Sequence, residues 1–176
     1  VNAMGWINTK DESMDWSLMF NKRVVVYGCG NILKGDDGAG PTIVNMLEEA
    51  GDLPDDVGLL DVGTSIKQVL FDMVVMDPKP ERIVVVDATT KDDRKPGEFW
   101  EVDVDEIIPK KVKDYSFHLF PSVNLLKEIR DETSVDVKIV VVQTKYIPDE
   151  LDETISEEVQ AALPGTSERG AGNVVR

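Results

Sequence analysis

The alternation of short β-branched runs with helical patterns limits the fold of this chain more than any other feature. Four apolar runs stand at residues 23–28 ("RVVVYG"), 57–63 ("VGLLDVG"), 81–90 ("ERIVVVDATT") and 135–144 ("VDVKIVVVQT"). Runs that are apolar on both faces are typical of strands buried between two layers of helices. We therefore expect these four segments to form a largely buried parallel sheet.

Amphipathic segments alternate with these runs. Apolar spacing and start signals predict helices at residues 40–51, 64–75, within 118–130 and at 154–163. At the last of these, Thr154 and Glu157 have the spacing of a capping box. The alternating segment 97–104 predicts one more strand. This order implies an α/β fold, namely a three-layer α/β/α sandwich around a mostly parallel twisted sheet.

The length and apolar content of the chain indicate one folded domain. It has 176 residues, of which 41% are hydrophobic, which is enough for a single core. We assign the folded domain to residues 23–163. We expect residues 1–22 to form a flexible N-terminal arm and residues 164–176 to form a disordered tail.

Charge and cysteine content exclude several classes of partner. Lysine and arginine number 19 against 34 aspartates and glutamates, a net charge of −15, which disfavours nucleic acid and anionic membranes. Cys29 is the single cysteine, so an internal disulfide or a multi-cysteine zinc site is excluded. Because the sequence shows neither a long apolar run nor a signal-peptide core, we expect a cytoplasmic location and no membrane anchor.

The stretch "GCGNILKGDDGAGP", residues 28–41, resembles a nucleotide-binding loop but fails both common patterns. Leu33 stands where the dinucleotide fingerprint needs its third glycine, and Asp36 stands where a P-loop needs its lysine. Asp36 and Asp37 would also repel a bound anion. We interpret Asp36 as a helix cap and Asp37 as a candidate cation ligand, since adjacent side chains point in different directions.

Polar residues that follow buried strands are further candidates, because ligands of open α/β sheets bind beyond the carboxyl ends of the strands. Within the run 81–90 the apolar stretch "IVVV" ends at Asp87, and His118, the only histidine, lies in a loop that could approach the same edge. Each has a structural alternative: Asp87 as a loop cap and His118 as a packed side chain. Together with Asp37 they form an O,O,N ligand set that suits nickel, zinc or cadmium.

Cys29 with His118 as its base would be an alternative catalytic pair. Cys29 lies between two glycines directly after a buried strand, however, where a cysteine more often packs as a small apolar residue. The sequence contains neither a GxSxG elbow nor an HExxH motif. A hydrolase here would therefore not use the familiar serine or zincin designs.

Three segments resemble one family in order and spacing: "GCGNILKGDDGAGP", "RIVVVDATTKDDRKPGEFW" and the histidine segment "SFHLFP". From about residue 23 to residue 163, the chain resembles the nickel-iron hydrogenase maturation endopeptidases. The "HLFP" segment is most similar to the branch that serves deazaflavin-reducing hydrogenases of methanogenic archaea. Some members have glutamate where this chain has Asp37. The aspartate side chain is one methylene shorter than that of glutamate.

The resemblance implies a peptidase that removes a C-terminal peptide from the hydrogenase large-subunit precursor after nickel insertion. It implies that Asp37, Asp87 and His118 are the metal-binding and catalytic residues. The nickel would come with the precursor, and cadmium, zinc or calcium could occupy the same ligands. Attack by a metal-polarised water and attack assisted by a carboxylate base both remain open. We expect a monomer or a weak homo-oligomer.

Two alternatives from other classes are open at this point. A receiver-like signalling domain would use Asp36 with Asp37 as its acid pair, Asp87 as phosphoacceptor and Lys145 as its strand-end lysine, although the glycine-rich loop and His118 would then be unexplained. A metal-binding module without peptidase activity would use the same three ligands.

Overall fold

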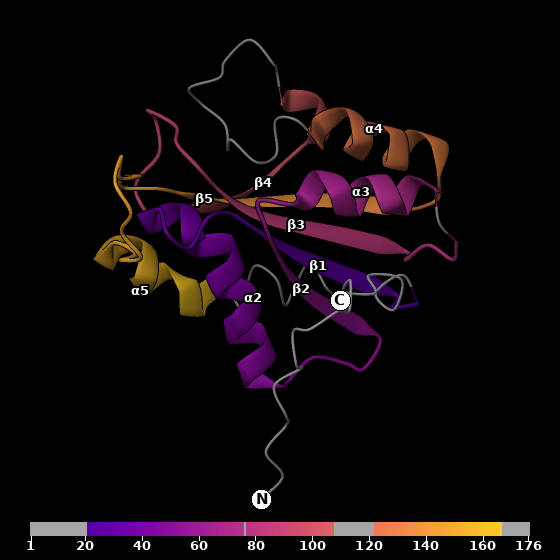
Figure 1. The fold of residues 1–176 in the computed structure, drawn as a ribbon, viewed down its shortest axis with the longest axis horizontal. Helices are drawn as coiled ribbons and strands as arrows, with labels where there is room; N and C mark the ends of the chain where they lie inside the picture. Colours follow the sequence, from indigo (N-terminus) through magenta and orange to yellow (C-terminus); the bar gives the residue numbers. More distant parts are fainter. Residues whose placement is uncertain (1–20, 76, 108–121, 167–176) are drawn as a thin grey trace, which may run out of the picture.

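The computed structural model describes residues 21–75, 77–107 and 122–166 (Figure 1). In chain order its elements are β1 (Val24–Cys29), the 3-10 turn η1 (Gly35–Gly38), α2 (Ala39–Ala50), β2 (Val57–Gly63), α3 (Ile66–Val75), β3 (Arg82–Thr89), β4 (Phe99–Val102), the 3-10 turn η2 (Val104–Glu106), α4 (Val123–Glu132), β5 (Asp136–Gln143) and α5 (Glu157–Thr166). All strands and helices predicted from the sequence are present.

The sheet has five strands in the order β2-β1-β3-β5-β4. The four apolar runs pair in parallel, and β4 is an antiparallel edge strand against β5. The predicted mostly parallel sheet is confirmed. The connections that leave β1 and β2 run in opposite directions across the sheet, so the strand order reverses between β1 and β3. In folds of this kind the crevice at that reversal, beyond the carboxyl ends of the strands, is the usual ligand site.

Helices cover both faces of the sheet, which makes the three predicted layers (Figure 1). On one face α3 and α4 contribute Leu70 and Leu126 to the same buried cluster as Tyr27 of β1. On the other face α2 and α5 pack through Ile43 and Val159 against the opposite side of the same strands. Because β1 and β3 lie between the two layers, their side chains are buried on both faces.

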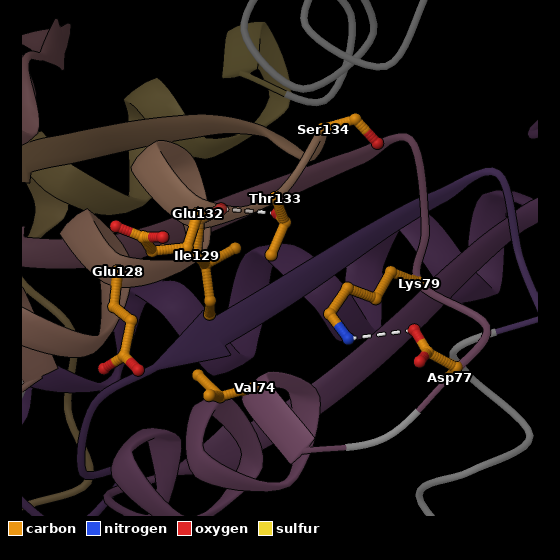
Figure 2. A pocket seen from close by; sticks show the side chains of 8 residues that line it. All are labelled: Val74, Asp77, Lys79, Glu128, Ile129, Glu132, Thr133 and Ser134. Carbon is orange, nitrogen blue, oxygen red and sulfur yellow. Dashed lines mark hydrogen bonds and ion pairs between the residues drawn. The ribbon is translucent and has the colours of Figure 1, made fainter.

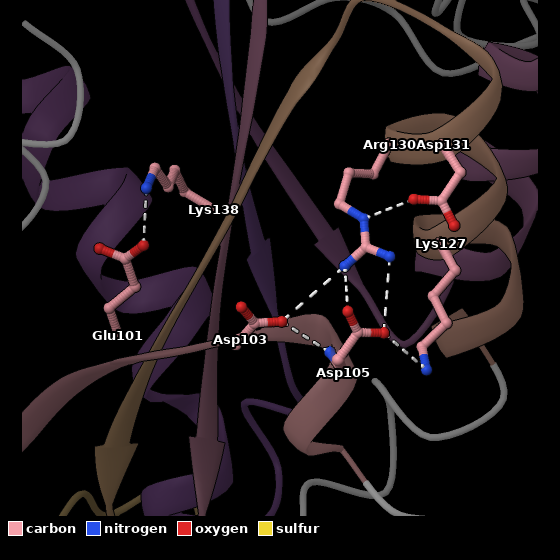
Figure 3. A network of polar contacts seen from close by, with 7 residues as sticks. All are labelled: Glu101, Asp103, Asp105, Lys127, Arg130, Asp131 and Lys138. Atoms are coloured by element: carbon pink, nitrogen blue, oxygen red, sulfur yellow. Dashed lines mark hydrogen bonds and ion pairs between the residues drawn. The ribbon is translucent and has the colours of Figure 1, made fainter.

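A surface ion-pair network joins η2 to α4 (Figure 3). The Arg130 Nη1 lies 2.8 Å from Asp105 Oδ2, and the Arg130 Nε lies 2.7 Å from Asp131 Oδ1. Lys127 adds a 3.1 Å contact to Asp105. The hydrogen bonds from Arg130 and Lys127 lower the pKa of the Asp105 carboxyl. The network holds η2 against α4.

The last helix differs in detail from its prediction. It begins at Glu157 and extends to Thr166, three residues beyond the expected end. The predicted capping box does not form, because the Thr154 N–H donates to Asp152 Oδ1 at 2.9 Å instead of to Glu157. The predicted arm and tail fall mainly on residues 1–20 and 167–176, outside the described residues.

None of the helices within residues 21–75, 77–107 and 122–166 combines the length and the apolar character that crossing a bilayer requires.

Candidate active site at the carboxyl ends of β1, β2 and β3

The glycines of residues 28–41 allow close packing at the ends of β1 and β3. A Cβ on Gly40 would lie 2.2 Å from the Cys29 carbonyl oxygen and 2.5 Å from that of Val86. Gly30 has φ +138°, and a Cβ there would lie 1.9 Å from the Asp37 carbonyl oxygen. Only glycine fits both places. These glycines bring the start of α2 against the strand ends and place the two aspartates there.

Asp36 is fully buried and holds two distant parts of the chain together. Its Oδ2 accepts hydrogen bonds from the N–H groups of Lys145 at 2.7 Å and Tyr146 at 3.2 Å, and from Ser156 Oγ at 2.9 Å. Its Oδ1 accepts from the Ser156 N–H at 2.7 Å. The predicted cap of the following helix was wrong: no side chain caps η1 or α2, and Asp36 instead binds Ser156, the residue that precedes α5.

Asp37 has different partners from its neighbour, as expected. Its side chain is nearly buried, and Oδ2 accepts a hydrogen bond from the Asn31 N–H at 2.9 Å. This bond joins the start of the loop after β1 to η1. The carboxylate of Asp37 is therefore held beside the end of β1, while that of Asp36 is directed toward α5.

Asp87 lies near the end of β3, two residues before its last residue, and is fully buried. Its Oδ1 accepts a hydrogen bond from the Ala88 N–H at 2.8 Å. The residue before it, Val86, pairs with Gly28 of β1, so Asp87 follows directly beside the glycine-rich loop. Burial of an ionised carboxylate is costly unless charge or hydrogen bonds compensate it. A cation is one such compensation.

The buried thiol of Cys29 is under the electrostatic influence of three carboxylates. Burial raises the pKa of its thiol, and the charges of Asp87, Asp61 and Asp37 raise it further. Cys29 is completely buried, so the thiol stays protonated and shielded from substrate. This result opposes Cys29 as a nucleophile and supports its interpretation as a packed apolar residue.

Asp61 is the site residue that the sequence analysis missed. It lies exposed near the end of β2, and its Oδ1 accepts from the Gly63 N–H at 2.9 Å. It lines a cavity of about 280 Å³ together with Asn31, Ile32 and Thr64. The signal was present in the sequence, since Asp61 follows an apolar run in the same way as Asp87 does.

His118, the third member of the predicted ligand set, lies outside the described residues. Within the part of the chain that the structure describes, no three histidine, cysteine, aspartate or glutamate side chains form a group that could hold a metal ion. Asp37 and Asp87 are thus the members of the predicted set that the fold brings to one edge of the sheet.

A larger cavity, of about 420 Å³, lies at the opposite edge (Figure 2). It is lined by the ends of α3 and α4 and by the segments that lead into β3 and β5, among them Val74, Lys79 and Glu132. Lys79 is paired there with Asp77 at 3.0 Å. Because this cavity is at the amino ends of the strands, it is not where an open α/β sheet usually binds its substrate.

The fold is that of a class of α/β peptidases, as comparison with known proteins shows. The family model for hydrogenase maturation proteases (HycI) matches residues 41–171. This chain belongs to the hydrogenase maturation protease family.

Relatives and solved structures agree with that assignment. The chain is 36% identical over 148 residues to a Methanocaldococcus jannaschii protein assigned to the hydrogenase maturation proteases, covering 82% of this chain and 92% of the relative. It is 32% identical over 131 residues to the delta subunit of the coenzyme F420 hydrogenase of Methanothermobacter thermautotrophicus, covering 73% and 78%. The [NiFe] hydrogenase maturation protease HybD of Thermococcus kodakarensis superposes with a TM-score of 0.66 at 29% identity, covering 86% of this chain and 99% of that chain.

The receiver-like alternative is set aside on the same evidence. Asp36 is buried and bonded to Lys145, Tyr146 and Ser156 rather than open to a magnesium ion. The Lys145 Nζ pairs with Glu158 at 2.7 Å. The family match is to peptidases.

Proposed function

We propose that this chain is the endopeptidase that removes the C-terminal extension from the large-subunit precursor of a nickel-iron hydrogenase after nickel has been inserted. One observation carries the proposal: in a chain of the hydrogenase maturation protease family, Asp37 and Asp87 are buried beside the ends of the adjacent strands β1 and β3. Two buried carboxylates at the usual ligand edge of the sheet are a suitable site for a substrate-borne cation.

In this proposal Asp37, Asp87 and His118 complete the coordination of the nickel that the precursor carries. Neighbouring carboxylates repel one another, and a divalent ion between them offsets that repulsion. With imidazole as third ligand, the set suits a borderline ion such as nickel. Without the precursor, cadmium, zinc or calcium would compete for the same ligands.

Chain geometry supports the inclusion of His118. β5 begins at the amino edge of the sheet, and α4 runs back to it, so the first turn of α4 lies toward the carboxyl edge. The described chain resumes at Ser122, directly before that turn. The described chain therefore returns to the fold toward the edge that carries Asp37 and Asp87, four residues after His118 in the sequence.

The reaction is hydrolysis of one peptide bond. Water attacks the scissile carbonyl carbon and loses a proton, the C–N bond breaks, and the leaving amine takes up a proton. Two routes fit these residues: either the nickel of the substrate polarises the water, or the carboxylate of Asp37 or Asp87 takes its proton directly. In both routes the nickel contacts fix the position of the scissile bond relative to the attacking water.

The protein partner in this proposal is the large-subunit precursor of a deazaflavin-reducing hydrogenase. The likeness to a protein named as a subunit of the coenzyme F420 hydrogenase supports that choice. A net charge of −15 speaks against nucleic acid as partner. We place the reaction in the cytoplasm, where a lone buried thiol such as Cys29 stays reduced.

Cleavage of the nickel-loaded precursor by single variants tests the proposal. We expect Asp37→Asn and Asp87→Asn each to lower the cleavage rate by about 100-fold or more, the range for loss of a catalytic proton acceptor. Asp92→Asn, which removes the same charge from an exposed site, is the matched control and should cleave at the wild-type rate. Thermal unfolding of each variant verifies that it is folded.

Undiminished cleavage by Asp37→Asn would refute the assigned role. Calorimetric titration with nickel or cadmium, compared with His118→Ala, tests the ligand set independently of activity. A wild-type protein that binds nickel with His118 but leaves the loaded precursor intact would instead be a metal-binding module without peptidase activity.

A further inference from the structure

Exposed apolar side chains are concentrated beside the candidate site. Among the described residues seven large hydrophobic side chains are exposed, and five of them lie on two loops, namely Ile32, Leu33, Tyr146, Ile147 and Leu151. We call these five residues the two-loop platform. The first loop follows β1 and the second follows β5, and Figure 1 shows both at the end of the sheet where β1 turns into η1. Clustering of this kind, unlike scattered exposure, marks an interaction surface.

Hydrogen bonds lock the two loops into one unit. The Asp152 N–H donates to the Leu33 carbonyl at 3.0 Å, and the Gly35 N–H donates to the Asp152 carbonyl at 2.6 Å. From the first loop, Lys34 Nζ donates to the carbonyl oxygens of Pro148 at 3.3 Å and Asp149 at 2.5 Å. The platform is therefore formed before any partner arrives, which reduces the entropy that binding must overcome.

The platform is continuous with the candidate site. Ile32 lines the same cavity as Asp61. The preceding residue, Asn31, donates its N–H to the Asp37 carboxylate. On the other side, the buried carboxylate of Asp36 binds the N–H of Tyr146. A chain segment that leaves the site along the first loop would therefore meet the apolar side chains of the platform next.

Acidic side chains surround the apolar ones. Asp149, Glu150 and Glu153 are exposed on both sides of Leu151 in the sequence. The two lysines of these loops are already engaged, Lys34 by the backbone carbonyls of the second loop and Lys145 by Glu158. The electrostatic field over the platform is negative, so it favours a cationic partner segment and disfavours an acidic one.

We propose that the two-loop platform docks the segment of the precursor next to the scissile bond, and that this segment carries apolar side chains beside lysine or arginine. The identity of the partner rests on the proposed function, whereas the chemistry of the segment follows from the platform itself. Docking there holds the peptide while the nickel ligands set its position. The platform contributes mainly to KM, because it touches no reacting atom.

The double variant Ile147→Ser/Leu151→Ser tests this docking. We expect it to raise KM for the nickel-loaded precursor, and Kd measured by fluorescence anisotropy, by about tenfold while kcat stays within about twofold of wild type. Phe71→Ser/Val75→Ser, two exposed apolar residues of α3, is the matched control and should leave KM and Kd unchanged. Glu150→Lys/Glu153→Lys should raise KM at low salt and weaken its dependence on NaCl.

The outcomes separate the two proposals. If wild type cleaves the precursor and the platform variant keeps its KM and Kd, the docking inference is wrong and the proposed function stands. If wild type does not cleave, the proposed function fails, and an unchanged Kd in the platform variant would overturn the docking inference as well. Sedimentation velocity tests whether the platform instead binds a second copy of this chain. A wild-type dimer that becomes monomeric in the platform variant would show this and would overturn the docking inference.

Discussion

At the scale of single residues, neighbouring aspartates do different work because the backbone turns between them. Asp36 accepts four hydrogen bonds from the segment 145–156, whereas the Asp37 carboxylate accepts from the Asn31 N–H in the loop after β1. A sequence pattern shows two equal carboxylates. The segments that pack on either side of η1 decide the two roles. Asp36 ties η1 to the segment 145–156, a contact that we call the Asp36 tether, whereas Asp37 is a candidate ligand.

The tether makes a prediction for stability. Asp36→Ala leaves the part-buried N–H of Lys145 and the buried N–H of Ser156 without an acceptor, so we expect the free energy of unfolding to fall by about 2–5 kcal/mol. Urea unfolding at pH 7 measures it. Asp72→Ala, which removes one hydrogen bond from Gln68 on the surface of α3, is the control and should cost less than about 1 kcal/mol. An equal loss in the two variants would contradict the tether.

At the scale of elements, the start of α2 is fitted to the strand ends by glycine. Gly40→Ala would gain helix propensity, yet its Cβ would meet the carbonyl oxygens of Cys29 and Val86. We therefore expect the free energy of unfolding to fall by about 3 kcal/mol or more, since neither strand can move away from the added Cβ. Gly51→Ala is the control: nothing lies within 4 Å of its Cβ, and only its left-handed φ of 64° costs energy, about 1–2 kcal/mol. Thermal unfolding would refute this if Gly40→Ala proved the more stable of the two.

The ion-pair network of η2 and α4 makes a prediction on pH. Hydrogen bonds from Arg130 lower the pKa of Asp131 and contribute to the lowered pKa of Asp105. A depressed carboxyl pKa gives stability that is present above the unfolded value and is lost as pH falls through the folded value. We expect Arg130→Gln to lower the unfolding temperature slightly at pH 7. The variant and wild type should unfold at the same temperature in acid, below the folded-state pKa values of Asp105 and Asp131, and also in high salt. A difference that persists in acid would contradict this assignment.

At the scale of the whole molecule, charge dominates the surface. The excess of acidic residues gives the chain a net charge of −15, and repulsion among like charges destabilises the folded state. Isolated exposed ion pairs contribute little stability against it. We expect the unfolding temperature to rise as NaCl is increased from about 0.05 to about 0.5 M, because salt screens the repulsion over about 10 Å or less. KCl should act equally, which distinguishes screening from binding of one ion. A falling unfolding temperature would mean that the ion pairs outweigh the repulsion.

The sequence by itself determined the fold class and the edge of the sheet that carries the candidate site. β-branched runs such as 81–90 are stable only when covered on both faces, and helices between them must cross from one strand to the next. The strand-end position of Asp87 follows from the same pattern. The glycine spacing excluded a phosphate loop because Leu33 and Asp36 occupy essential positions of the known motifs.

Only the tertiary structure decided which residues meet. The bonds of Asp36 to Tyr146 and Ser156 span 110 and 120 residues, and no local pattern encodes a pairing of that separation. The electrostatic effect of Asp61, Asp37 and Asp87 on Cys29, and the joining of two loops into the two-loop platform, depend on strand order in the sheet. Local preferences act over a few residues, whereas these contacts arise from the packing of whole elements.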